Sequence, residues 1–532
     1  MTSTTSRRTS SRRASSPAPA LAGVVAVGAA LAAGELAAVP VSPDASPYFA
    51  VGSSVVDHSP EAVRKWAIET FGVADKLALF IGMGILIAVL AAVCGYLERR
   101  RPPLGSVVIA AFGLLGVLAA SNRPDATWTN ALPSIVAGVV GVVVLRILIS
   151  QLGPAPANPD ETDGESAEDE PKPAARSDFT RRFVLTAGGI AAAAVVVGVV
   201  ARRVLADTAG VVADRARVLL PRAADQAPPV PAGAELEVSG ATPFMTSNAD
   251  FYRIDTALQV PTLTTGQWRL RIHGDVDREV TLSWDDLLAM PMTERIVTLA
   301  CVSNEVGGDL VGNAKWLGVP MREVLDLAGV RPGSDMLLST SVDGWTCGTP
   351  ISAITDGRDA LLAVGMNGSP LPLEHGYPVR QVVPGLYGYV SATKWVVDWE
   401  ITRFSEAKAY WSTRGWSEFG PIKMASRFDR PADGTEHPAG EVVVAGTAWA
   451  QHTGVERVEV RVDQGPWQPA ELTTEYSIDT WRQWKFVWQA TKGNHTLECR
   501  AIDRQGKPQI ERYQAPAPDG ASGLDDRTYT IV

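Results

Sequence analysis

The chain has few cysteines and few histidines, and their scarcity excludes several kinds of protein. Its 532 residues include 4 cysteines and 6 histidines. The cysteines are scattered, at Cys94, Cys301, Cys347 and Cys499. This spacing provides neither a disulfide framework nor a CxxC metal site. No histidine lies in a long apolar run and no CxxCH motif is present, so we expect no haem.

Net positive charge is also absent. The formal net charge is -10, which does not suggest a nucleic-acid partner. The chain is long enough for roughly three domains. Its hydrophobic content of 46% can supply both large cores and membrane spans.

Long apolar runs are concentrated in the first 205 residues. A bilayer core is about 30 Å thick, so a helix of about 20 apolar residues crosses it. Runs of this kind lie near 18–39, 77–97, 104–120, 131–149 and 183–200. We predict a cytoplasmic tail at 1–17, about four transmembrane helices within 18–150, and a fifth at 181–205.

Basic residues predict the orientation of these helices. They cluster before the first run, after the second and before the fifth, at Arg7, Arg8, Arg12, Arg13, Arg99, Arg100, Arg101, Arg181 and Arg182. All three clusters face the cytoplasm if the N-terminus does. An odd number of spans then leaves everything after 205 outside the cytoplasm, so we predict a multi-pass protein of the cell membrane. Glu35 lies inside the first run, where a charge is a functional candidate unless it lies near the helix end.

Two stretches have the composition of linkers. Residues 151–180 are acidic and Pro-rich, and 206–235 contain QAPPVPAG. Between them, TRRFVLTAGG places Arg181 and Arg182 before an apolar run, as in a twin-arginine export signal. The alternative is a positive flank of a membrane helix. An export signal of this type carries folded, cofactor-loaded domains.

The remaining chain changes character twice. Residues 236–428 mix short strands with helices, which predicts an α+β domain. Ser283 with Asp286 predicts a capped helix start, and Gly329 a helix end. Residues 429–532 read as short alternating strands, which predicts a β-sandwich with Cys499 in its core. The tryptophans there are expected in the core or at an interface: Trp449, Trp481, Trp484 and Trp488.

Cys301 ends a strand-like run in TLACVSNEVGG and admits three interpretations. It is a buried structural thiol, a nucleophile or a metal ligand. Free cysteines are most often buried and structural. A nucleophile needs a neighbouring His or Lys, whereas the adjacent polar residues are Asn304 and Glu305. A soft thiolate suits a metal better.

Four stretches follow one another between about 240 and 510: TSNADFYRIDTALQVP, TLACVSNEVGGDLVGNAKWLGVPM, LLAVGMNGSPLPLEHGYPVRQVVPGLYGYVSATKWVVDWEI and a sandwich beginning with GTAWA. This ordered set resembles the sulfite-oxidase family of molybdopterin-dependent oxidoreductases, in a bacterial, membrane-anchored form. The resemblance implies a central α+β molybdopterin-binding domain and a C-terminal immunoglobulin-like sandwich of the dimerisation type, which follow the N-terminal transmembrane helices predicted from the apolar runs.

The resemblance also implies roles for individual residues. At the position of Cys301 the family has a catalytic cysteine that supplies a thiolate to molybdenum. The cofactor contacts implied are Asn248, Phe251, Tyr252, His375, Arg380, Ser391 and Lys394. An anionic phosphate needs converging cations, hydroxyls and backbone donors.

Each of these residues also has a simpler interpretation. Arg380 and Lys394 are otherwise surface charges. His375 and Asn248 are otherwise turn caps. Phe251 and Tyr252 are otherwise core residues.

The chain departs from the family near the substrate. Asn304, Glu305 and Val306 stand where sulfite oxidases carry arginines, and Val364 stands where they carry a tyrosine. A pocket for a small dianion needs fixed positive charges, so sulfite itself is in doubt. Arg253 and Tyr387 are further candidates to reach the metal.

The implied activity is oxygen-atom transfer at a molybdenum centre on a small molecule or an oxidised protein, with electrons exchanged with a separate partner. A homodimer is the assembly that the resemblance implies. Two alternatives stay open. One is a reductase of methionine sulfoxide in exported proteins, and the other is a membrane-anchored binding or scaffold protein without catalysis.

Overall fold

The computed structural model describes residues 16–42, 45–60, 63, 66, 70, 75–122, 127–152, 180–205 and 208–532. Most of the predicted tail, 1–17, and most of the predicted acidic linker, 151–180, lie outside these residues. The chain divides into two compact units, residues 1–207 and 208–532.

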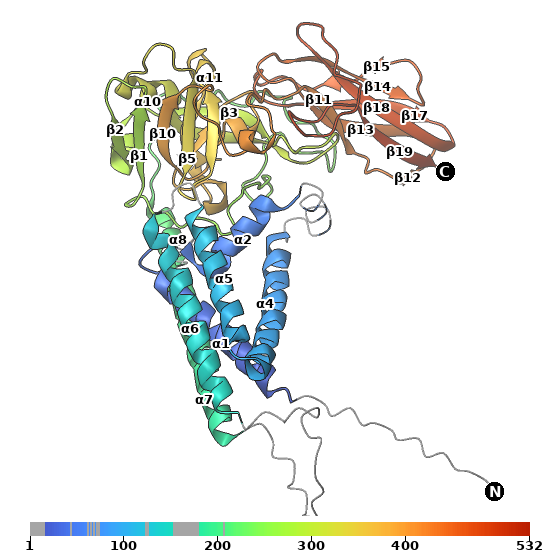
Figure 1. The fold of residues 1–532 in the computed structure, drawn as a ribbon. Coiled ribbons are helices and arrows are strands. Elements are labelled where there is room, and N and C mark those ends of the chain that lie inside the picture. Colours follow the sequence, from blue (N-terminus) through green and yellow to red (C-terminus); the bar gives the residue numbers. More distant parts are fainter. Residues whose placement is uncertain are drawn as a thin grey trace, which may run out of the picture. The chain divides into compact units, whose positions relative to one another are not determined.

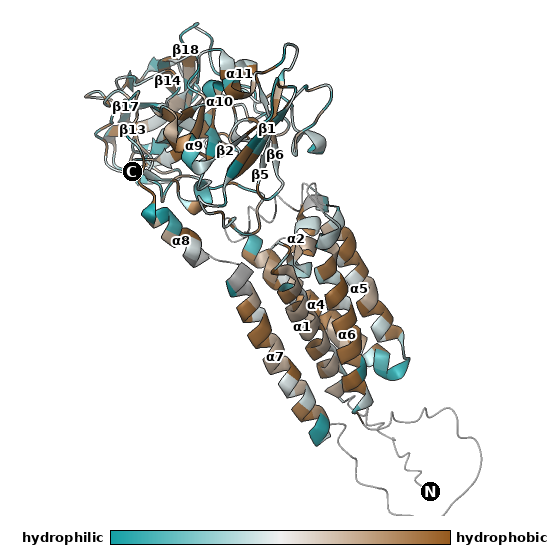
Figure 2. Ribbon diagram, turned by 90° about the vertical axis from the view of Figure 1, so that its left-hand side faces the viewer, coloured by the Kyte–Doolittle hydropathy of each residue, from teal (hydrophilic) through white to brown (hydrophobic). Residues whose placement is uncertain are grey.

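The first unit is a bundle of apolar helices (Figure 1). Its elements are α1 (Ala18–Ala38), α2 (Pro47–His58), α4 (Asp75–Arg100), α5 (Leu104–Ser121), η3 (Trp128–Ala131), α6 (Leu132–Ser150) and α7 (Arg181–Leu205). Among the described residues, five helices are long and apolar enough to cross a membrane, at the positions of the five predicted runs. Their hydrophobic residues extend along most of their length (Figure 2).

Glycines allow close packing between α1 and α4. A Cβ added to Gly23 would overlap the carbonyl group of Ala91, and one added to Gly95 would overlap the carbonyl group of Pro19. The two backbones are therefore in direct contact, as small residues permit between helices in a membrane.

The stretch between the first two predicted transmembrane helices contains α2. Ser46 precedes this helix, and its Oγ donates a hydrogen bond of 2.8 Å to Oε1 of Glu35, which is 4% exposed. Glu35 therefore joins α1 to the start of α2, and it lies within the last turn of α1.

The central part of the second unit contains two sheets. Their strands are β1 (Arg269–Gly274), β2 (Val280–Ser283), β3 (Thr293–Ala300), β4 (Val311–Pro320), β5 (Met336–Ser341), β6 (Thr346–Pro350), β7 (Leu361–Met366), β8 (Ser369–Pro370), β9 (Arg380–Val382) and β10 (Val396–Thr402). One sheet has the order β2-β1-β10-β5-β6, with β1 and β10 parallel. The other has the order β3-β4-β7-β8, and β9 also pairs with β7.

Short helices connect these strands. They are α9 (Trp284–Ala289), α10 (Met321–Ala328), α11 (Ser352–Thr355), η5 (Leu373–His375), η6 (Gly388–Val390) and η7 (Ser412–Arg414). The predicted capping box is confirmed, because Ser283 Oγ accepts from Asp286 N and the Asp286 carboxylate accepts from Ser283 N. The end of α10 at Gly329 is also confirmed, and this residue has φ of 72°.

The prediction of a plain linker at 206–235 is corrected by the structure. It contains α8 (Thr208–Arg217), which is hydrogen-bonded to the central part of the unit. Arg215 Nε donates to the carbonyl oxygen of Leu371 at 2.7 Å, and Tyr377 Oη donates to Asp214 Oδ2 at 2.7 Å. A helix of this length is stabilised by tertiary contacts, which Asp214 and Arg215 make here.

The C-terminal part is a sandwich of two sheets, at the red end of the ribbon (Figure 1). Its strands are β11 (Ala425–Arg430), β12 (Glu436–His437), β13 (Gly440–Trp449), β14 (Val455–Val462), β15 (Gln468–Pro469), β16 (Glu471–Leu472), β17 (Arg482–Ala490), β18 (Gly493–Asp503) and β19 (Asp525–Ile531). The sheets have the orders β11-β13-β17-β16 and β12-β19-β18-β14-β15.

Residues from both sheets share one apolar core, in which Cys499 and Trp484 are fully buried, as predicted. Trp449, Trp481 and Trp488 are also buried, as predicted. The sandwich begins earlier than predicted, because Ala425–Arg430 already pairs with β13. The finer identification of an immunoglobulin-like fold stays a prediction.

Candidate active site

Cys301 directly follows β3 and is 9% exposed. Its N–H donates to Leu310 O at 2.9 Å, and its Sγ accepts from Ser303 N at 3.4 Å. Burial raises the pKa of the thiol, whereas the backbone N–H groups of Ser303 and Val302 and the charge of Lys394 lower it. No His or Lys is hydrogen-bonded to Sγ among the described residues, so the nucleophile interpretation has no adjacent base.

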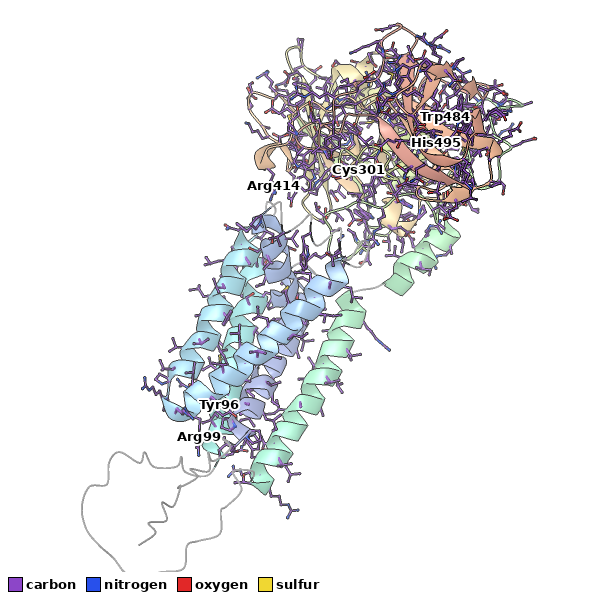
Figure 3. The ribbon with its side chains drawn as sticks, turned by 90° about the vertical axis from the view of Figure 1, so that its right-hand side faces the viewer. Tyr96, Arg99, Cys301, Arg414, Trp484 and His495 are labelled. Carbon is purple, nitrogen blue, oxygen red and sulfur yellow. The ribbon has the colours of Figure 1, made fainter. Side chains whose placement is uncertain are left out.

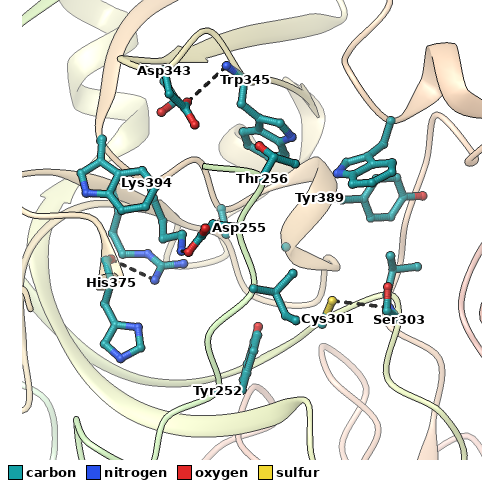
Figure 4. Close-up of a pocket in the computed structure, with 18 of the residues that line it drawn as sticks. Tyr252, Asp255, Thr256, Cys301, Ser303, Asp343, Trp345, His375, Tyr389 and Lys394 are labelled. Atoms are coloured by element: carbon teal, nitrogen blue, oxygen red, sulfur yellow. Dashed lines mark hydrogen bonds and ion pairs between the residues drawn. The ribbon is translucent and has the colours of Figure 1, made fainter. Parts of the chain in front are cut away.

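Cys301 lines a cavity of about 940 Å³, counting its part open to solvent, inside the second unit (Figures 3 and 4). Six of the eight predicted site residues line it: Phe251, Tyr252, Cys301, His375, Arg380 and Lys394. The most distant pair, residues 251 and 394, is separated by 143 positions in the sequence. The tertiary fold therefore brings these segments together. His375 and Lys394 lie on one side of the cavity, and Cys301, Ser303 and Tyr389 lie on the other (Figure 4).

Arg380, at the start of β9, is a buried cation. It is 5% exposed, and no carboxylate forms an ion pair with it within the described part of the chain. Its Nη1 donates to His375 O at 3.2 Å, and its guanidinium lies 4.9 Å from the ring centroid of Trp316. Burial lowers the pKa of Arg380 to about 10, so the group is still charged at neutral pH. A buried cation without a counter-ion is stabilised when an anion binds beside it.

Lys394 is also buried but has a counter-ion. Its Nζ lies 3.0 Å from Asp255 Oδ2 and donates to Glu374 O at 3.1 Å. Burial lowers its pKa to about 8, although the charge of Asp255 raises it. The alternative that Arg380 and Lys394 are surface charges is therefore wrong.

His375 is neutral at physiological pH. Burial, followed by the charge of Arg380, lowers its pKa to about 4. Its Nε2 lies 3.1 Å from the carbonyl oxygen of Asn248, which only accepts hydrogen bonds, so the proton is on Nε2 and Nδ1 is an acceptor. The ring of Phe251 packs edge-on against it at 5.6 Å.

Two predicted residues do not line the cavity. Asn248 accepts from Asn367 Nδ2 at 2.8 Å through its side chain, and its carbonyl group holds His375. Ser391 is fully buried, and its Oγ donates to the carbonyl oxygens of Tyr387 and Leu386. Both residues shape the turns beside the cavity.

Neither additional candidate lines the cavity. Arg253 Nε pairs with Asp255 at 3.0 Å. Tyr387 lines a second, smaller hollow, where its Oη accepts from Lys423 N at 3.3 Å. Burial, and to a smaller extent the nearby Cys301, raises its pKa to about 12.

The sandwich holds the loop that follows Cys301. Arg427 of β11 donates through Nη1 to the carbonyl oxygen of Gly308 at 2.6 Å. Gly307 has φ of 72° and lies against the carboxylate of Asp525, where a Cβ would overlap it. Asn304 Oδ1 accepts from Leu310 N at 2.8 Å, so this side chain closes the loop.

Sequence reasoning missed several residues of the cavity. Asp255 lies three positions after Tyr252 in a stretch already singled out, and its carboxylate faces Lys394. Other cavity-lining residues that were missed include Asp343, Trp345, Tyr389, Trp411 and Trp416. The density of aromatic residues in AYWSTRGWSEF was the available signal for the last two.

Comparison with known proteins agrees with this geometry. Residues 257–411 match the family model described as an oxidoreductase molybdopterin binding domain. Mitochondrial sulfite oxidase of Rattus norvegicus is 30% identical over 49% of this chain and 56% of that protein. The oxidoreductase YuiH of Bacillus subtilis is 32% identical over 30% of this chain and 78% of that protein.

A third relative is the protein-methionine-sulfoxide reductase catalytic subunit MsrP of Campylobacter jejuni, which is 28% identical over 33% of this chain and 64% of that protein. The chain spans about half the length of the sulfite oxidases that it matches.

These matches and the cavity define an oxidoreductase with a molybdopterin-binding domain. The chain belongs to the sulfite-oxidase family of molybdopterin-dependent oxidoreductases.

The residues present fit a molybdenum–molybdopterin group. Cys301 offers a soft sulfur ligand. Arg380 offers a buried charge for a phosphate. Two cavity-lining residues, Ser341 and Trp345, have a buried Oγ and Nε1 without hydrogen-bond partners among the described residues. Unpaired buried polar atoms indicate a missing polar partner.

Proposed function

We propose that this protein is a membrane-anchored, extracytoplasmic oxidoreductase that holds a molybdenum–molybdopterin group and carries out oxygen-atom transfer on a substrate other than plain sulfite. The observation that carries this proposal is that one cavity is lined by Cys301 and by the buried Arg380, which forms no ion pair with a carboxylate among the described residues.

Within this proposal, each side chain has a defined task. Cys301 Sγ is the protein ligand of the metal, and Arg380 binds the phosphate. Lys394 assists Arg380 while paired with Asp255. Neutral His375 offers Nδ1 as an acceptor for an N–H of the pterin, since Nε2 is bound to Asn248. Phe251 and Tyr252 provide an aromatic wall, and Asn248 and Ser391 act through the turns that they hold.

The bound group supplies two-electron oxygen-atom transfer, and the protein positions it and controls access. Arg380 is buried, so its electrostatic contacts are stronger than they would be in water. The fixed loop after Cys301 holds the sulfur in place through Ser303 N and Gly308 O.

A substrate other than sulfite is favoured by the residues after Cys301. Asn304 is used within its own loop, Glu305 is acidic and Val306 is apolar, so none supplies the fixed charge that a small dianion requires. The similarity to MsrP supports the alternative of a reductase of methionine sulfoxide in exported proteins.

Anchoring and partners complete the proposal. Five helices long enough to cross a membrane precede residue 208 among those described, and the arginine clusters favour a cytoplasmic N-terminus. The proposed order is cytoplasmic tail, four spans, linker, fifth span with a twin-arginine-like start, catalytic domain at 236–428 and dimerisation-type sandwich at 429–532. Electrons are exchanged with a separate protein partner.

The test is metal and pterin analysis of the full chain, purified in detergent from a host that makes the cofactor. The full chain is used so that α8, which packs on the central domain, is retained. We expect one molybdenum and one pterin per chain, and oxidation of the reduced protein by sulfoxides to exceed reduction of the oxidised protein by sulfite. A chain without stoichiometric molybdenum would indicate a scaffold protein. Fast turnover of sulfite would indicate that sulfite is the substrate after all.

A further inference from the structure

One side of the cavity is lined by aromatic rings that the proposed cofactor contacts do not use. The ring centroids of Trp411 and Trp416 are 6.1 Å apart, and the ring centroid of Tyr389 is 5.9 Å from that of Trp416. All three residues line the cavity. Tyr389 is buried, and the two tryptophans are partly buried and pack against the same core. We call Tyr389, Trp411 and Trp416 the aromatic cluster.

Hydrogen bonds to the backbone hold the aromatic cluster together. Trp416 N donates to Trp411 O at 3.2 Å, which closes the turn that carries both tryptophans. Tyr389 Oη donates to Ser417 O at 2.9 Å and so joins η6 to this turn. The hydroxyl proton of Tyr389 is used in this contact, so the ring is what Tyr389 contributes to the cavity wall. A surface fixed in this way loses little conformational freedom when a ligand binds.

The aromatic cluster lies near the proposed metal ligand and away from the proposed phosphate contact, so the present inference rests on the proposed function. Arg380 Nη1 donates to His375 O at 3.2 Å, which places the phosphate contact beside His375. Tyr389 lies with Cys301 across the cavity from His375 (Figure 4). The aromatic cluster is therefore at the end of the cavity where the metal is held and the substrate reacts.

We infer that the aromatic cluster binds an apolar substituent of the substrate, which is an organic compound whose reacting atom carries an alkyl or aryl group. Aromatic rings offer large apolar areas and pack favourably against other rings. Binding is stabilised in proportion to the apolar area that is removed from water. Ile254 lines the same cavity and is 48% exposed, so it adds an apolar residue at the opening. Sulfite has no apolar substituent and gains nothing from this surface.

The probes are methyl phenyl sulfone and dimethyl sulfone, which share a fully oxidised sulfur and differ in one substituent. Each is titrated calorimetrically into the full-length holoprotein in detergent, and the heat of titration into protein-free micelles is subtracted. We expect methyl phenyl sulfone to bind about tenfold more tightly, because a phenyl ring buries more apolar area than a methyl group. Equal affinities, or no detectable binding of either sulfone, overturn the inference.

Variants of two tryptophans locate the binding surface. Trp416→Ala is expected to reduce the ratio of the two affinities from about tenfold to about twofold, and Trp416→Phe, which retains a ring, to keep most of it. Trp467→Ala is the matched control and is expected to leave the ratio unchanged. Trp467 lies in the sandwich between the guanidinium groups of Arg461 and Arg500 and does not line the cavity. A reduced ratio in both alanine variants, or in neither, contradicts the assignment to the aromatic cluster.

Molybdenum, pterin and thermal unfolding are measured on the same preparations. Absence of molybdenum and pterin from the wild-type protein overturns the proposed function, whereas the ratio of the two affinities decides the present inference. A Trp416→Ala variant that unfolds at the wild-type temperature but has lost its pterin would show that the aromatic cluster holds the cofactor, which also overturns the inference.

Discussion

At the scale of single residues, the site is distinguished by a buried cation that has no counter-ion among the described residues. Within the described part of the chain, Arg380 is a charged guanidinium at 5% exposure that donates to the carbonyl oxygens of Gln381 and His375, lies over the ring of Trp316 and forms no ion pair with a carboxylate. Such a group destabilises the cofactor-free protein and is compensated when a phosphate binds.

Arg380→Met tests this statement through two effects, one on stability and one on pterin content. Methionine retains the apolar contact with Trp316 and removes the buried charge, so the cofactor-free protein should become more stable by about 1 kcal/mol or more. The pterin content of the protein purified from a cofactor-competent host should fall at the same time. Thermal unfolding and pterin analysis measure the two effects. A variant that retains full pterin content shows that Arg380 does not hold the phosphate.

The site residues recovered from sequence all lie in the quoted stretches, although Asp255 and Tyr389, which lie in the same stretches, were missed. HGYPVR and SATK indicated Arg380 and Lys394, but their burial follows only from the sheets around them. Asn248 and Ser391 were predicted as contacts because they belong to NADFY and SATK, whereas their side chains are hydrogen-bonded to Asn367 and to the backbone of the preceding turn. Asp343 has no neighbouring signal, because it lines the cavity through the turn between β5 and β6.

At the scale of elements, local rules predicted much of the secondary structure. The capping residues Ser283 and Asp286 and the positive φ of Gly329 depend on neighbours within a few positions. By contrast, α2 and α8 depend on tertiary partners, Glu35 for the start of α2 and the Leu371 carbonyl group for Arg215 of α8. Short helices that depend on such partners have no strong signal of their own.

The contact between α1 and α4 gives a test at this scale. Gly23→Leu places a side chain against the backbone of Ala91 and should destabilise the first unit by about 1 to 3 kcal/mol. Gly28→Leu is the matched control in the same helix, because nothing lies within 4 Å of its added Cβ. Unfolding in detergent measures both variants. Equal stability of the two would contradict the close packing of these helices.

At the scale of the whole molecule, the second unit combines a catalytic-type domain with a sandwich that holds its key loop. Arg427 and Asp525 belong to the sandwich and contact Gly308 and Gly307, seven and six positions after Cys301. The sandwich is therefore part of the active-site architecture, a relation that no local pattern in the sequence indicated.

The most direct test of the central claim is X-ray absorption at the molybdenum edge, on the full-length holoprotein and on Cys301→Ser. Cys499→Ser, which changes a buried thiol in the sandwich core, is the control. The account predicts one sulfur ligand fewer per molybdenum in Cys301→Ser, with the pterin retained and redox activity lost, and an unchanged spectrum in Cys499→Ser. An unchanged sulfur count in Cys301→Ser, or full turnover by that variant, would contradict the assignment of Cys301 as the metal ligand.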